Sequence, residues 1–243
     1  MKVFSRLKRT KMITESMKMS DIIGQNIFLR PILNRFGINS GTGEMTINTI
    51  CTNKGIELKS FLAILNTHNS QKYFPKPEDV EINVLIPFLK STHTYYLDYT
   101  LQRIEKLLTL ISVDCPENKF LSMIELFYTE YKKQLTLHIE YEETELFPLI
   151  MKILNKQIKI SENSDYYSEK IQHEHINVED KLSDLKIILI KFLPPGVNEN
   201  LANELLFELS RFEKELLDHA RFEDKILIPK LMKLLKSKPV RNG

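Results

Sequence analysis

Six side chains that could bind a metal ion form two copies of one pattern in this sequence. Each copy has a histidine, a second histidine after a nearly equal interval, and a glutamate four residues later: His93, His138 and Glu142, then His175, His219 and Glu223. In both copies a proline follows six residues after the glutamate. Because the chain has only six histidines, chance is a poor explanation of the repeat. Imidazole and carboxylate groups bind iron, manganese or zinc, so the repeat predicts one metal centre between two helical hairpins.

Apolar residues recur every three or four positions around these candidates, which predicts amphipathic helices with the candidates on the buried face. The stripe with the first His/Glu pair contains Phe120, Ile124, Phe127, Tyr131, Leu135, His138, Glu142, Glu145 and Leu149. The stripe with the second pair contains Leu205, Leu209, Phe212, Leu216, His219, Glu223, Ile226 and Leu227. Residues spaced i, i+4 lie one above the other on a helix, so both side chains of a pair can reach a common ion.

Two further stripes each supply one inward histidine. The first stripe contains Leu85, Leu89, His93, Tyr96, Thr100, Ile104 and Leu107. The third stripe contains Ile171, His175, Val178, Leu182, Leu185 and Leu189. His173 lies two residues from His175 and therefore points away from this stripe, so we expect it at the surface. His68 lies in a polar segment outside the stripes, and we expect a linker residue there rather than a ligand.

A network of hydrogen-bonded histidines and carboxylates without a metal is the alternative interpretation of these residues. Burying two glutamates among Phe, Leu and Ile is costly unless each is paired or bound to a cation. The basic residues nearby, such as Lys132, Lys133 and Arg221, lie off the stripes. The sequence therefore favours metal binding by all six residues, and no catalytic residue is expected beyond these ligands.

Composition favours a helical fold, because the 243 residues include seven glycines, ten prolines and no tryptophan. The net charge is +2, and basic runs near the two ends have no aromatic interleaving, so we expect no nucleic-acid partner. Cys51 and Cys115 lack CxxC spacing, which indicates a reducing compartment, and we expect Cys51 in a core. Without a secretory signal or a long apolar stretch, we expect a cytoplasmic protein with no membrane partner. Met12, Met17 and Met19 leave a later natural start open.

Turn and capping residues divide the chain into five segments. We expect a disordered or extended N-terminus (1–16), a small helical domain (17–66), a linker (67–79), a four-helix bundle (80–236) and a tail (237–243). In the small domain, Ser20 or Asp21 and Thr46 are the predicted N-caps. The bundle helices should break at 114–116, 161–165 and 194–196. Short breaks between long helices predict an all-α, up-down four-helix bundle.

The bundle motifs resemble those of a known family. The two His-x-x-x-Glu motifs, each followed by Leu-Phe-Pro or Leu-Ile-Pro, and Glu174-His175 in the third stretch resemble the hemerythrin-like four-helix domain over about residues 80 to 236. The whole chain resembles more narrowly the repair-of-iron-centres family, in which a small helical domain precedes that bundle. The resemblance implies a non-haem di-iron centre with an oxo or hydroxo bridge, two bridging glutamates and four terminal histidines: Glu142, Glu223, His93, His138, His175 and His219.

The resemblance also implies a stress-response function. The family repairs iron–sulfur clusters damaged by nitric oxide or oxidative stress, which could proceed by iron donation, by nitric oxide reduction at the di-iron centre, or by both. Damaged iron–sulfur proteins would be the partners, with O2 or NO as small ligands. Whether the protein is an enzyme, and whether it is a homodimer, stay open. The alternative is a non-catalytic hemerythrin-like protein that binds or senses O2, NO or iron.

One feature of the family is absent. Its small domain usually carries a Cys-Cys pair in a glycine-rich turn, whereas the matching residues 36–43 contain no cysteine. We therefore expect no thiol chemistry from this turn. The specific part of the resemblance is the set of bundle motifs, although the small domain favours repair because a simple carrier needs only the bundle.

Overall fold

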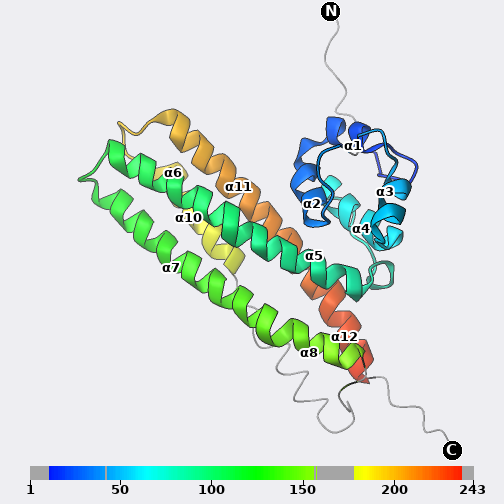
Figure 1. The fold of residues 1–243 in the computed structure, drawn as a ribbon. Coiled ribbons are helices and arrows are strands. Elements are labelled where there is room, and N and C mark those ends of the chain that lie inside the picture. The colour runs from blue at the N-terminus through cyan, green and yellow to red at the C-terminus, as the bar shows by residue number, and fades with distance from the viewer. Residues whose placement is uncertain (1–10, 42, 156, 158–177, 237–243) are drawn as a thin grey trace, which may run out of the picture. The chain divides into compact units, whose positions relative to one another are not determined.

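The structure, a computed structural model, describes residues 11–41, 43–155, 157 and 178–236. Within these ranges every regular element is a helix, and an isolated β-bridge joins Lys18 and Thr46 (Figure 1). The predicted all-α fold is confirmed. The chain forms two compact units, residues 1–91 and 92–243. In the described part of the chain, no helix combines the length and hydropathy needed to cross a membrane.

Short helices form the described part of the first unit. They are α1 (Met19–Gln25), η1 (Ile27–Leu29), α2 (Arg30–Arg35), α3 (Ile47–Lys54), α4 (Leu58–Asn69) and η2 (Pro77–Asp79). Phe36 packs against the rings of Phe61 and Phe88, with centroids 4.8 and 5.1 Å away. These three rings lie among the buried aliphatic residues of the first unit and help to join its helices into one core.

One predicted cap of the first unit is confirmed and the other is wrong. The Thr46 hydroxyl accepts a hydrogen bond from the backbone N–H of Thr49, as an N-cap should. Helix α1 instead begins at Met19 without a side-chain cap, and Ser20 lies inside it. The backbone N–H groups of Met19 and Ser20 already donate to carbonyl groups of residues 45 and 43. Because tertiary hydrogen bonds satisfy these donors, no capping side chain is needed.

Helix α4 extends into the segment that the sequence assigned to a linker. His68 lies in the last turn of this helix, 5.9 Å from the ring of Phe88, so its assignment to a linker is wrong. Asn66 is buried and exchanges two hydrogen bonds with the backbone of Ile13, at 2.7 and 2.9 Å. The helix therefore continues because its polar residues satisfy buried backbone groups of the N-terminal segment. The polar composition of this segment alone does not show that the helix continues through it.

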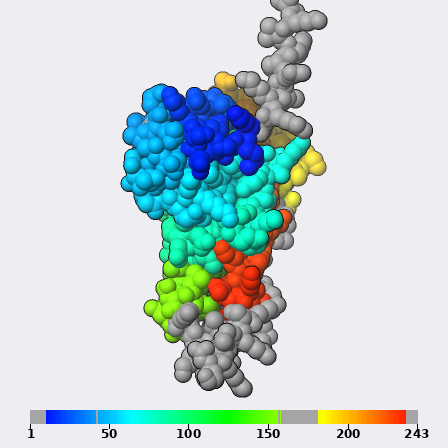
Figure 2. All heavy atoms as spheres, turned by 90° about the vertical axis from the view of Figure 1, so that its right-hand side faces the viewer, coloured from blue at the N-terminus to red at the C-terminus, as the bar shows by residue number. Residues whose placement is uncertain are grey.

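Three long helical stretches and α10 form the described part of the second unit, and the first stretch begins with α5, whose N-terminal part belongs to the first unit. The helices are α5 (Ile82–Tyr95), α6 (Leu101–Asp114), α7 (Lys119–Tyr141), α8 (Phe147–Leu154), α10 (Val178–Phe192), α11 (Glu199–Phe222) and α12 (Ile228–Lys236). Helices α6, α7, α10 and α11 pack in a ring, each against two of the others (Figure 1). Their buried faces share one apolar core. Farther along, α8 and α12 lie side by side (Figure 2).

The breaks predicted at 114–116 and 194–196 are confirmed, and the break at 161–165 lies outside the described residues. The side chain of Asn118 caps α7 by accepting hydrogen bonds from the backbone N–H groups of Phe120 and Leu121. Asn198 caps α11 in the same way. The first connection is therefore short, and so is the second, in which Gly196 adopts a positive φ of 95°. Short connections between long helices give the predicted bundle.

In the described ranges, three π-helical turns interrupt the long helices, and the sequence did not predict them. They are η3 (Tyr96–Thr100), η4 (Glu142–Leu146) and η6 (Glu223–Leu227). In the last two, the N–H of Phe147 donates to the carbonyl of Glu142 and that of Ile228 donates to the carbonyl of Glu223. The residue after each donor is a proline, which cannot donate and which clashes with the carbonyl four residues earlier in an α-helix. The wider turn removes that conflict, and the repeated proline therefore marks the repeated π turn.

The π turn also explains one wrong expectation about the buried stripe. Glu145 was expected to face inward, but its side chain is exposed, whereas Leu146 and Phe147 are buried. A regular helix would bring the position three residues after Glu142 back to the same face. The extra residue of the π turn shifts the buried face onward by about one position.

Cys51 lies on the buried face of α3, as predicted, with 2% of its surface exposed. Burial raises the pKa of its thiol to about 11, helped by the negative charge of Glu57. A thiol reacts as the thiolate, so Cys51 is inert at neutral pH in the folded protein. Cys115 is partly exposed at the end of α6.

We expect one rapidly reacting thiol per folded chain. An alkylating or disulfide-exchange reagent at pH 7 should modify Cys115 quickly and Cys51 only after denaturation. Thiol titration of Cys115→Ser with and without denaturant checks this. Rapid labelling of the folded variant would contradict the buried placement of Cys51.

Candidate metal centre

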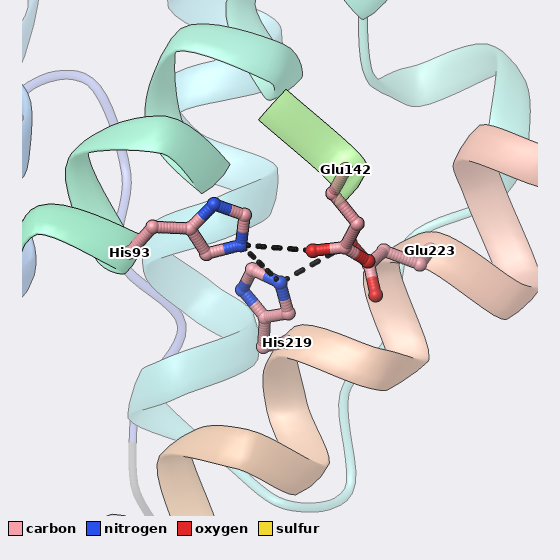
Figure 3. Close-up of side chains that lie close together, drawn as sticks. All are labelled: His93, Glu142, His219 and Glu223. Carbon is pink, nitrogen blue, oxygen red and sulfur yellow. Dashed lines mark hydrogen bonds and ion pairs between the residues drawn. The ribbon is translucent and has the colours of Figure 1, made fainter. Parts of the chain in front are cut away.

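Four of the six predicted ligands meet inside the second unit. His93, Glu142, His219 and Glu223 each offer one ligand atom, and these atoms all lie within 4.8 Å of one another (Figure 3). All four side chains are buried. They come from three long helical stretches, with His93 on α5, Glu142 opening η4, and the other pair at the junction of α11 and η6. Residues far apart in the sequence thus form one cluster.

The two imidazoles point their Nε2 atoms at each other and at the carboxylates. The Nε2 atoms of His93 and His219 are 3.1 Å apart. His93 Nε2 lies 3.2 Å from Glu142 Oε2, and His219 Nε2 lies 3.1 Å from Glu223 Oε1 (Figure 3). Two nitrogen ligands about 2.1 Å from one ion and about 90° apart would be separated by about 3 Å. The spacing therefore matches two ligands of a single ion.

The protonation of His93 shows why a cation fits this cluster. Its Nδ1 lies 2.9 Å from the carboxylate of Glu143, which can only accept, so Nδ1 carries the hydrogen. In the neutral ring Nε2 then presents a lone pair toward Glu142 and toward His219. Lone pairs facing lone pairs repel in a water-poor interior unless a proton or a metal ion lies between them. The donor set fits a divalent metal such as iron.

Among the described residues, the carboxylate of Glu142 faces His93 and His138, at 3.2 and 3.3 Å. Only 1% of the residue is exposed, and no described residue donates a hydrogen bond of regular geometry to either oxygen. Burial and the nearby negative charge of Glu223 raise the pKa of Glu142, against the opposing effect of His93. Burial would lower the pKa of His93, but the surrounding carboxylates, led by Glu142, outweigh it and the pKa is raised. The site therefore attracts positive charge.

His138 approaches the cluster from the other side of Glu142. Its Nε2 lies 3.3 Å from Glu142 Oε1, while His93 faces Oε2 of the same carboxylate. His138 is not one of the four residues whose ligand atoms all lie within 4.8 Å. Each oxygen of Glu142 thus faces a different histidine, as expected of a carboxylate that could bridge two metal ions.

The remaining predicted histidines lie outside the described residues. These are His175, expected as the sixth ligand, and His173, expected at the surface. The first stripe and the stripe with the second His/Glu pair are buried as predicted, and the ring centroids of Tyr96 and His219 are 5.9 Å apart. On α7 the buried face includes Leu121, Tyr128 and Ile139, whereas the predicted Phe120, Phe127 and His138 are only partly buried.

Sequence reasoning missed Glu143 and the stacking of Phe147. The ring of Phe147 lies parallel to that of His93, with an interplanar angle of 6° and centroids 5.7 Å apart. Glu143 was overlooked because it lies off the apolar stripe. One pattern could have identified it: an acidic residue directly follows the candidate glutamate in both copies, as Glu143 and as Asp224.

Comparison with known proteins agrees with this arrangement. Residues 84–231 match the model of the hemerythrin HHE cation-binding domain. The chain is also 21% identical over 228 residues to the iron–sulfur cluster repair protein ScdA of Staphylococcus haemolyticus (strain JCSC1435). That alignment covers 90% of this chain and 99% of the relative, so it includes the segment before the bundle. The chain belongs to the hemerythrin-like family and carries that family's cation-binding domain.

Proposed function

We propose that this protein is a non-haem di-iron protein that repairs iron–sulfur clusters damaged by nitric oxide or oxidative stress. The observation that carries the proposal is the buried cluster of two imidazoles and two carboxylates, in a chain similar over 90% of its length to an iron–sulfur cluster repair protein. Damaged iron–sulfur proteins are then its clients, and the cytoplasm is its compartment.

The proposed ligands divide between two metal positions. His93 and His219, with Glu142 Oε2 and Glu223 Oε1, would hold one ion, because these atoms converge. His138 and Glu142 Oε1 would contribute to a second position. His175 is proposed as a further ligand from the sequence repeat alone. The two-sided contacts of Glu142 support two ions rather than one.

Iron suits this set of ligands and would supply redox chemistry. Imidazoles and carboxylates bind it in both ferrous and ferric states, and six protein ligands shared by two ions leave positions for small molecules such as NO or O2. Two carboxylates balance only half of the charge of two ferrous ions. The reduced centre should therefore hold iron less firmly than the oxidised one, which suits donation of iron to a damaged cluster.

The first prediction concerns the metal content. Purified protein should contain about two irons per chain, because each copy of the motif supplies two histidines and one bridging carboxylate. Glu142→Ala should lose most of this iron, whereas Glu140→Ala, which removes an exposed carboxylate of the same helix, should keep it. Elemental analysis measures both. Equal iron in the two variants would exclude Glu142 as a ligand.

A second prediction uses the metal-free protein. Burial and Glu223 disfavour the negative charge of Glu142, so Glu142→Gln should raise the unfolding free energy of metal-free protein at neutral pH by roughly 1–3 kcal/mol. With iron bound, the order should reverse, because only the carboxylate can bridge. Urea unfolding with and without iron measures this. A less stable metal-free variant would indicate that Glu142 is structural.

The third prediction separates repair from sensing. Reduced protein should lose iron to a competing chelator faster than oxidised protein, and it should restore activity to a nitric-oxide-damaged iron–sulfur enzyme such as aconitase. His138→Ala and Glu223→Ala should abolish that recovery. If the reduced protein kept its iron, gave no recovery and bound O2 or NO reversibly, the carrier or sensor hypothesis would replace repair.

A further inference from the structure

We propose that Glu143 is a positioning residue of the metal centre, holding His93 in the one orientation and tautomer that direct its Nε2 lone pair at the ion. The inference rests on the proposed metal site and adds a residue that is not itself a ligand. It is carried by the 2.9 Å hydrogen bond from His93 Nδ1 to Glu143 Oε1.

The local packing fixes the plane of the His93 ring but not its direction. Phe147 lies parallel to the imidazole, at an interplanar angle of 6°. A half-turn of the ring about the bond from Cβ leaves it in the same plane, so this stacking is nearly equal in both orientations. The half-turn exchanges Nδ1 with a carbon atom, and Nε2 with another carbon. Phe147 therefore cannot decide whether a nitrogen or a C–H group faces Glu142 and His219.

The hydrogen bond to Glu143 makes that decision. Only one ring orientation places Nδ1 against the carboxylate, and only the tautomer with hydrogen on Nδ1 can donate to it. Both choices leave Nε2 unprotonated and directed at the cluster, 3.2 Å from Glu142 Oε2. An anionic acceptor on the far nitrogen also makes the imidazole a stronger electron donor to a bound metal, which favours the ferric state.

The exposed fractions of the His93 and Glu143 side chains fit the roles of ligand and positioning residue. The His93 side chain is 1% exposed, whereas that of Glu143 is 35% exposed. Water partly solvates the Glu143 carboxylate at the edge of the site and stabilises its negative charge. The His93 imidazole that it orients is shielded from water. Glu142 and Glu143 are consecutive in η4 yet contact opposite nitrogens of one imidazole. The π turn therefore presents a bridging ligand and an orienting residue together.

The test uses the full-length chain loaded anaerobically with ferrous iron, with Glu143→Ala, Glu143→Gln and the matched control Glu140→Gln on the preceding turn. Glu143→Ala should weaken ferrous binding by about 10- to 100-fold in competition with a chromophoric chelator. It should also raise the midpoint potential, because the anionic partner that favours the ferric state is lost. Glu143→Gln keeps an oxygen acceptor, so its affinity should fall less, but its potential should rise because the charge is gone.

These outcomes separate the orienting role from a structural one and from the function itself. A merely structural glutamate would change folding without a graded shift of the potential, and the nearly isosteric Gln variant guards against misfolding of the Ala variant. If wild type binds iron and both Glu143 variants match Glu140→Gln in affinity and potential, the inference is overturned while the proposed function stands. If wild type binds no iron, both fall together, and elemental analysis of the wild-type protein identifies that case.

Discussion

The convergence of electron pairs in a water-poor core is the constraint on which the rest of this structure depends. His93 and His219 direct Nε2 atoms at each other and at the two buried carboxylates of Glu142 and Glu223. Such an arrangement is unfavourable without positive charge, because a charge removed from water must be paired or bound. Burial, which raises the pKa of Glu142, is therefore also the reason that this cluster favours a cation.

The helices around the cluster depart locally from regular α-helical geometry, and these π turns help to place the candidate ligands. Each candidate glutamate opens a π turn, and each turn is followed by a proline that a regular helix would not accommodate. Widened turns cost regular hydrogen bonds, and they occur often at functional sites. Here the widening at η4 brings Phe147 onto the imidazole of His93 and keeps Glu145 outside. The widened turn η4 thus begins at the candidate ligand Glu142.

The first unit has a separate core and no part in the described cluster. Its only cysteine, Cys51, is buried with a thiol pKa of about 11, and the glycine-rich residues 36–43 contain none. The similarity to an iron–sulfur cluster repair protein nevertheless extends over 99% of that relative. Any role of this unit in delivery must therefore use surfaces other than a reactive thiol.

The sequence alone determined the fold class, the bundle and the four candidate residues that the structure brings together, because helical periodicity and a duplicated spacing can be read directly from the residues. His93, Glu142, His219 and Glu223 were identified this way, and their stripes predicted that they face inward. The tertiary structure alone decided three other features. The π turns follow from bonds between a carbonyl and a residue five positions later, which a constant period of 3.6 residues cannot represent. The contact of Glu143 with His93 joins two helices, and the start of α1 depends on carbonyl groups that lie distant in sequence. A repeated residue can mark such a feature in the sequence, as Glu143 and the prolines do, but only the packing shows which group each residue contacts.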